Sequence, residues 1–303
     1  MSNNQLVSCI VTTYKRQPDM VIRAVKSILN QTYVNIEVIV VDDSPSSYTY
    51  RSEVERRVIS LNNKIKYIKH EYNKGACAAR NTGIIHSSGE FVAFLDDDDE
   101  WLPTKLEKQI KLFDNPKVGL VYCRQRISKS GNLIEPQNEL FRGSVYNRIL
   151  ERNFIGSTSF VIMRKSIIKE AGCFDEQMPS AQDLDLWIRV LKLSECDYVD
   201  EPLVIYYVHG NECITANPTK KLIALKRLNQ KYWKDILENK RVMWKRIIVL
   251  TPFFIQTGSY SEAIRNYIKA VRIKPLYIKE NIIMFLKCIK IFVNNVLLTK
   301  KER

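Results

Sequence analysis

The 303-residue sequence lacks paired cysteines, a targeting segment and a long uninterrupted apolar run. Its seven cysteines are scattered and odd in number, without a C-x-x-C pair, which argues against a disulfide framework and a zinc site. The first residues, MSNNQLVSCIV, show no basic segment followed by an apolar one, so we expect no signal peptide. These absences favour a reducing compartment and a cytoplasmic protein.

The composition is that of a globular protein, with 45% hydrophobic and 26% charged residues. The net charge of +14 is unevenly placed. Residues 219–303 hold 20 Lys and Arg against 5 Asp and Glu, which is +15, so residues 1–218 carry −1. We therefore expect two parts, 1–218 and 219–303. The basic second part suggests a polyanionic partner such as an anionic membrane face, a nucleic acid or an acidic polymer.

The first part alternates strand-like and helix-like segments. Strands are predicted at Leu6–Val11, Ile36–Val41, Ile65–Ile68, Phe91–Leu95 and Val118–Tyr122, and helices at Met20–Leu29, Ala76–Ile85 and Pro103–Phe113. Further segments follow: a strand at Phe160–Met163, a helix at Leu184–Leu193 and an edge strand at Val199–Val208, which contains Pro202. Near-continuous apolar strands separated by helices predict an α/β protein with a mostly parallel sheet, flanked by helices and followed by a helical extension.

The stretch FVAFLDDDDEW places four carboxylates directly after an apolar strand. Adjacent like charges repel, so we expect a bound divalent metal ion, and not a side chain, to supply the compensating charge. Three predicted strands end in polar residues, at Thr12–Tyr14, Asp42–Ser44 and Asp96–Asp99. Ligands of parallel sheets bind beyond the carboxyl ends of the strands, so we expect these residues to converge.

Further motifs accompany this block in a fixed order. They are VSCIVTTYKR, Asn30-Gln31-Thr32-Tyr33, IEVIVVDDS, Asn73-Lys74-Gly75 with Ala79-Arg80-Asn81, SGEFVAFLDDDDEWLPTKLE, Gly172–Glu176 and Gln182–Trp187. Together they resemble family 2 glycosyltransferases over about Leu6 to His209. The resemblance implies a GT-A fold and the transfer of a sugar, with inversion, from a nucleotide diphosphate donor to a hydroxyl of a glycan or lipid-linked acceptor.

The resemblance implies a metal site for Mn²⁺ or Mg²⁺ in the acidic block. Asp98 would be the metal ligand and Asp97 would face the ribose or a metal-bound water, with Asp96 and Asp99 as flanking candidates. A hard divalent cation neutralises the leaving diphosphate. Some relatives complete this site with a histidine at the position of His209, although a lone histidine is more often structural. The alternative is a solvated acidic turn before the next helix.

The nucleotide contacts are also carried over from the family. Asp43 would hydrogen-bond the base, usually uracil, and Thr12 and Tyr14 would line its other side. Many members have proline before threonine here, whereas this sequence has Thr-Thr. Asn73 and Arg80 are further nucleotide contacts. The alternatives are an Asx turn at Asp43 and a helix-surface charge at Arg80.

The acceptor side needs a group that takes the proton of the attacking hydroxyl. Asp183 matches the acidic base of the family, and as an alternative or additional role it is the N-cap of the predicted helix. Helical periodicity turns Asp185 away from Asp183. Trp187 is interpreted as a core residue, with a sugar platform as the alternative.

The basic C-terminal part contains an amphipathic segment, Asn281–Leu298, in which lysines interrupt the apolar run. It predicts peripheral contact with the anionic inner face of the cell membrane, as expected for an enzyme of surface polysaccharide assembly. The alternative is a helical bundle against the first part or a second subunit. Two other function classes are a haloacid-dehalogenase-like phosphohydrolase and a basic nucleic-acid-binding protein. The residues around the acidic block do not fit the phosphohydrolase. We find no recognisable nucleic-acid-binding module, so we expect no nucleic-acid partner.

Overall fold

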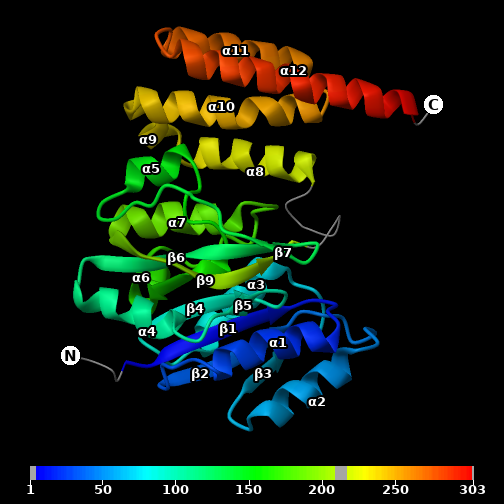
Figure 1. Cartoon of the computed structure of the whole chain (residues 1–303), viewed down its shortest axis with the longest axis vertical. Helices are drawn as coiled ribbons and strands as arrows, with labels where there is room; N and C mark the ends of the chain where they lie inside the picture. Colours follow the sequence, from blue (N-terminus) through cyan, green and yellow to red (C-terminus); the bar gives the residue numbers. More distant parts are fainter. Residues whose placement is uncertain (1–4, 209–216, 302–303) are drawn as a thin grey trace. The chain divides into compact units, whose positions relative to one another are not determined.

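The computed structural model describes residues 5–208 and 217–301 (Figure 1). The chain forms two compact units. The first comprises the described parts of residues 1–145, 154–177 and 182–210, and the second those of 146–153, 178–181 and 211–303. Two short segments from the middle of the chain therefore group with the C-terminal helices, and the single boundary expected at residue 218 remains a prediction.

Within the described residues, the first unit is built on one nine-stranded sheet of order β3-β2-β1-β4-β8-β6-β9-β5, with β7 beside β6. The strands are β1 (Val7–Thr13), β2 (Ile36–Asp42), β3 (Lys66–Lys69), β4 (Phe91–Asp96), β5 (Glu100–Trp101), β6 (Val118–Lys129), β7 (Asn132–Ile134), β8 (Val161–Arg164) and β9 (Glu195–Tyr207). Strand β8 runs antiparallel to both β4 and β6, which therefore point the same way. The other links along β3-β2-β1-β4 and between β6 and β9 are parallel, which confirms a mostly parallel sheet.

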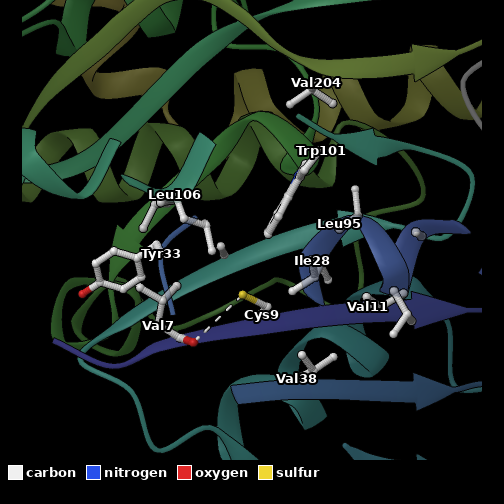
Figure 2. Close-up of a cluster of buried hydrophobic side chains, with 14 of the residues drawn as sticks. Val7, Cys9, Val11, Ile28, Tyr33, Val38, Leu95, Trp101, Leu106 and Val204 are labelled. Carbon is white, nitrogen blue, oxygen red and sulfur yellow. Dashed lines mark hydrogen bonds between the residues drawn. The ribbon is translucent and has the colours of Figure 1, made fainter. Parts of the chain in front are cut away.

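Helices cover both faces of this sheet (Figure 1). They are α1 (Pro18–Leu29), α2 (Arg51–Leu61), α3 (Ala76–His86), α4 (Lys105–Ile110), α6 (Lys165–Glu170) and α7 (Gln182–Leu193), with short 3-10 turns η1 (Lys111–Asp114) and η2 (Thr158–Phe160). Cys9 and Val11 of β1 lie in the same buried cluster as Ile28 of α1 (Figure 2). Ile10 points to the opposite face, where it meets Gly83 of α3. Burial on both faces explains why β1, β2 and β4 are apolar at most positions.

Two local expectations differ from the structure. The predicted edge strand is β9, but β5 pairs with it and occupies the edge. Pro202 is tolerated there because pairing with β6 is irregular, with register shifts on both sides of Arg124. Helix α7 begins at Gln182, so Asp183 lies in its first turn and is not the N-cap.

The second unit is helical. It contains α5 (Tyr146–Glu151), α8 (Pro218–Lys231), α9 (Trp233–Glu238), α10 (Lys240–Gln256), α11 (Tyr260–Ile273) and α12 (Ile278–Lys301). Trp244 of α10, Ala270 of α11 and Met284 of α12 share a small buried core. The Trp244 indole N–H donates to Asn281 of α12 at 3.2 Å. Among the described residues, we find no helix with the length and apolar content that crossing a bilayer requires.

Candidate functional site

The polar ends of three neighbouring strands meet at one edge of the sheet. Thr12 of β1 pairs with Asp96 of β4, and Thr13 pairs with Asp42 of β2. The predicted convergence is therefore confirmed. It follows from parallel pairing, because the carboxyl ends of adjacent strands then lie side by side.

Asp96, the first carboxylate of the block, is held by polar groups of the chain. The Arg80 guanidinium binds it at 2.8 Å, and the hydroxyls of Ser157 and Thr158 donate to it at 3.1 and 3.2 Å. Burial raises the pKa of Asp96, but Arg80 and these hydroxyls outweigh burial and hold it below its usual value. Arg80 is largely buried and is not the surface charge that was the alternative.

Asp97 and Asp98 share one cation. Arg16 Nε lies 2.8 Å from Asp97 Oδ1, and Arg16 Nη2 lies 2.7 Å from Asp98 Oδ2. The Thr13 hydroxyl also bonds Asp97. Burial raises the pKa of Asp97 to about 7, against the opposing effect of Arg16. The Asp98 side chain is 21% exposed and that of Asp97 only 6%, so Asp98 is the one of the two that solvent reaches more easily.

Asp99 turns back into the protein. Its carboxyl group is fully buried, lies 2.6 Å from the Ser159 hydroxyl and accepts the Tyr207 backbone N–H at 3.2 Å. Burial, together with the charges of Asp96 and Asp98, raises the pKa of Asp99 well above its usual value. Asp99 therefore ties the acidic loop to β9 and η2.

These contacts correct the expectation that a metal ion alone compensates the acidic block. Arg16 and Arg80 supply two positive charges from the chain itself. The raised pKa values of Asp97 and Asp99 also leave the block with less negative charge than four free carboxylates would carry. The chain itself thus offsets part of the negative charge of the block.

Asp43 organises the loop before α3. Its buried carboxylate accepts the backbone N–H groups of Lys74 and Gly75, both at 2.8 Å, and contacts His70 Nδ1 at 2.7 Å. Three donors leave about one acceptor position of the carboxylate for a ligand. Asn73, in the same loop, is exposed. The predicted role of Asp43 in binding the base would use this remaining acceptor position and stays a prediction.

The other predicted base contacts follow β1. Thr12 is half-buried at the strand end, and Tyr14 is 43% exposed just beyond it. Lys15 has a left-handed backbone, with φ of 50°, and its N–H donates to Ser44 Oγ at 2.8 Å. This bond fixes the turn after β1 to the end of β2. An exposed tyrosine ring on an anchored turn is suited to stacking on a base.

Arg80 links the acidic block to the start of α7, where the predicted catalytic base Asp183 lies. Arg80 Nη1 contacts Gln182 at 3.3 Å, and the charge of Asp183 contributes to raising the pKa of Arg80. Asp185 is buried and paired with Arg189 at 2.7 Å, which agrees with its predicted orientation away from Asp183.

Trp187 is fully buried, and its indole N–H donates to the Gly156 carbonyl at 3.3 Å. Its interpretation as a core residue is confirmed, and a role as a sugar platform is ruled out by the absence of exposed surface.

Residues 5–208 and 217–301 contain no group of three or more His, Cys, Asp or Glu side chains arranged to hold a metal ion. Asp97 and Asp98 still fit a hard divalent cation that arrives with a nucleotide. Their carboxylates already converge on one cationic group, and phosphate oxygens would supply further ligands. His209 lies outside the described residues, so its role as a ligand remains a prediction.

Sequence reasoning assigned no role to Arg16, Thr13 or His70. Arg16 stands at the end of the motif VSCIVTTYKR, where its distance from the acidic block in the sequence hides the ion pairs. His70 has no partner pattern in the sequence because Asp43 is 27 residues away. Only strand pairing brings these groups together.

The architecture is that of GT-A glycosyltransferases. The chain is similar in structure to TarS 1–349 of S. aureus in complex with UDP-GlcNAc, with a TM-score of 0.66 and 18% identity over 94% of this chain and 89% of that one. It is also similar to the mannosyltransferase PcManGT of Pyrobaculum calidifontis in complex with GDP-Man and Mn²⁺, with a TM-score of 0.64 and 17% identity over 97% and 87% of the two chains.

The sequence comparisons agree with this class. The model of glycosyl transferase family 2 matches residues 8–172. The putative colanic acid biosynthesis glycosyl transferase WcaA of Escherichia coli K12 is 33% identical over 82% of this chain and 94% of its own. WfgD of E. coli, a UDP-Glc:alpha-D-GlcNAc-diphosphoundecaprenol beta-1,3-glucosyltransferase, is 32% identical over 63% and 71% of the two chains. The chain belongs to glycosyl transferase family 2, which sets the phosphohydrolase interpretation aside.

Proposed function

We propose that this protein is an inverting glycosyltransferase that moves a sugar from a UDP-sugar to a hydroxyl of a glycan or lipid-linked acceptor in surface polysaccharide assembly. One observation carries the proposal. Arg80 bonds both Asp96, at the end of β4, and Gln182, at the start of α7. Arg80 therefore holds the strand ends, where the donor would bind, close to the start of α7, which carries Asp183 as the residue proposed to activate the acceptor.

The donor would bind along the strand ends. Asp43 would accept the base N–H, Tyr14 would stack on the ring, and Thr12 and Asn73 would complete the nucleoside site. Asp98, with Asp97 beside it, would hold Mn²⁺ or Mg²⁺, which offsets the charge of the diphosphate when bound. Both carboxylates lie within 2.8 Å of a single cationic group, and this proximity supports the assignment.

Asp183 would accept the proton of the attacking hydroxyl. It lies half-buried in the first turn of α7, which limits its movement. The hydroxyl oxygen would form a bond to the anomeric carbon as the bond to the diphosphate breaks on the opposite face, so the configuration inverts. General-base assistance of this kind contributes about 10²–10⁴-fold to the rate.

The acceptor class is supported by the names of two relatives. WcaA is named for colanic acid biosynthesis, and WfgD for transfer to a diphosphoundecaprenol-linked sugar. A lipid-linked acceptor lies at a membrane, and the second unit has the composition for membrane contact. Helices α11 and α12 expose apolar side chains next to lysines and arginines, which suits the surface of an anionic bilayer.

Donor hydrolysis and sugar transfer test the proposal directly. With a panel of nucleotide sugars and MnCl₂, we expect turnover with a UDP-sugar and its loss on chelation with EDTA. Asp98→Asn should lose at least about 10²-fold in turnover, and Asp183→Asn should lose transfer by about 10²–10⁴-fold while still binding UDP. Asp114→Asn, an exposed carboxylate in η1, is the matched control. Full transfer by Asp183→Asn would reject its role as the base.

A further inference from the structure

Arg16 occupies the carboxylates to which the metal site is assigned. Its guanidinium forms two ion pairs, one with Asp97 at 2.8 Å and one with Asp98 at 2.7 Å. The Arg16 side chain is 28% exposed, so it is neither locked in the core nor free in solvent.

The backbone holds Arg16 in this place. Lys15 adopts the left-handed conformation, which is unfavourable for a residue with a side chain by about 1 kcal/mol. The bond from the Lys15 N–H to Ser44 Oγ at 2.8 Å offsets that cost and fixes the turn. The turn directs the next side chain across the end of β1 toward β4. The position of Arg16 is therefore set by the fold as well as by its ion pairs.

We propose that Arg16 is the resident counter-cation of the metal site: it competes with the divalent ion for Asp98 and moves its guanidinium to the diphosphate when the nucleotide binds. The inference rests on the proposed function and deepens it. A guanidinium and a divalent ion on the same carboxylates repel each other at a separation of a few ångströms. A diphosphate removes that conflict, because it adds negative charge and binds a guanidinium through two parallel hydrogen bonds.

The consequence is coupling between metal and nucleotide. Without nucleotide, the metal must displace Arg16 from Asp98 and binds weakly. With nucleotide, Arg16 has a new partner and the carboxylate is released to the metal. Each ligand then raises the affinity of the other by the same factor, as linkage requires. Arg16 thus keeps the acidic loop ordered while the site is empty and favours the joint loading of metal and donor.

Metal binding in the absence of turnover tests this directly. The affinity for Mn²⁺ alone is measured from the free-Mn²⁺ EPR signal with full-length protein. In Arg16→Gln, we expect Mn²⁺ alone to bind roughly two- to fivefold more tightly than in the unchanged protein, the range that loss of one part-exposed ion pair allows. Arg16→Lys keeps the charge but loses the planar guanidinium that pairs with both carboxylates, so its Mn²⁺ affinity should lie between those of the unchanged protein and Arg16→Gln. Lys26→Gln, an exposed cation on α1, is the charge-matched control and should leave the affinity unchanged.

Calorimetry then measures the coupling. UDP is titrated with saturating MnCl₂ and with EDTA, and GDP is run as a second nucleotide. The ratio of the UDP affinity with MnCl₂ to the UDP affinity with EDTA should fall roughly two- to fivefold in Arg16→Gln, the value of one lost ion pair, and should not fall in Lys26→Gln. A thermal melt followed by circular dichroism shows whether each variant is folded. If Arg16→Gln is unfolded, the comparison is made with Arg16→Lys.

The outcomes separate the two proposals. If the unchanged protein binds UDP with Mn²⁺ but neither Arg16 variant binds Mn²⁺ alone more tightly, the counter-cation role is overturned and the proposed function stands. If neither UDP nor GDP binds to any of the proteins with Mn²⁺ present, both fail together.

Discussion

Lys105 lies fully buried in the core of the first unit, in a motif shared with the acidic block. Its ammonium sits 4.2 Å from the centre of the Trp101 ring, and among the described residues it has no hydrogen-bond partner. Burial lowers the pKa of Lys105 to about 8, and the nearby thiols of Cys9 and Cys123 do not reverse this. A buried lysine without a carboxylate partner makes stability depend on pH.

The sign of that dependence follows from proton binding. Between pH 8 and 10.5 the unfolded chain binds the Lys105 proton more fully than the folded one, so the contribution of Lys105 to the free energy of unfolding rises with pH across this window. A pKa lowered from 10.5 to about 8 corresponds to a rise of about 3 kcal/mol. Urea unfolding from pH 7 to 10 should show this rise as a growing difference between the unchanged protein and Lys105→Met, because the buried thiols, whose raised pKa values act in the opposite direction, are present in both. The exposed Lys64→Met is the control, and an equal slope in both variants would contradict the prediction.

At the scale of elements, the close approach of α3 to β1 positions Arg80. A Cβ added at Gly83 would lie 2.4 Å from Ile10 Cγ2, well inside van der Waals contact. Only glycine lets the helix lie this close to the strand. Arg80, one turn before Gly83 in the same helix, can then reach Asp96 at the end of β4.

Gly83→Ala therefore tests this packing. Alanine favours the helix intrinsically by up to about 1 kcal/mol, but the clash with Ile10 costs about 1–3 kcal/mol, so we expect a net loss of roughly 1–2 kcal/mol in the free energy of unfolding. In an Ile10→Ala background the clash disappears, and the same substitution should be neutral or stabilising. Urea unfolding of the four proteins gives the coupling. A loss of equal size in both backgrounds would show that the contact is not the cause.

At the scale of the whole molecule, positive charge and exposed apolar surface occur together in the second unit. The ring centres of Tyr260 in α11 and Phe292 in α12 are 5.3 Å apart, and those of Tyr267 and Phe285 are 5.6 Å apart. The two helices therefore share a surface. We call this the α11–α12 face. Its exposed apolar side chains are Tyr260, Ile264, Ile268, Ile278, Ile282, Phe285, Leu286, Ile289 and Phe292. Its exposed basic side chains are Arg265, Lys269, Arg272, Lys279, Lys287 and Lys290.

Vesicle flotation tests the proposed membrane contact. We expect the protein to float with vesicles that contain phosphatidylglycerol, to bind neutral phosphatidylcholine vesicles far less, and to dissociate as salt rises. Leu286→Asp with Ile289→Asp should weaken binding by at least about tenfold, because two apolar side chains no longer enter the interface. Leu133→Asp with Ile134→Asp, exposed in β7, is the matched control. Equal flotation of both double variants would reject the α11–α12 face as the contact.

The sequence by itself determined the α/β class, the parallel strands β1, β2, β3 and β4, and the convergence of their polar ends. Apolar runs bounded by helices leave few arrangements other than a sheet covered on both faces. Ordered motifs identified the family. Helix α2 was not predicted, because Arg51–Leu61 buries only three residues and shows little amphipathic pattern.

Tertiary structure alone decided how the acidic block is balanced. Arg16 lies 81 residues from Asp97 in the sequence, and Asp43 lies 27 from His70. No local pattern links them. The strand order brings these groups within hydrogen-bond distance, and the charge of Arg16 then opposes the rise that burial causes in the pKa of Asp97. Charge compensation depends on distance in space, and the sequence records only distance along the chain.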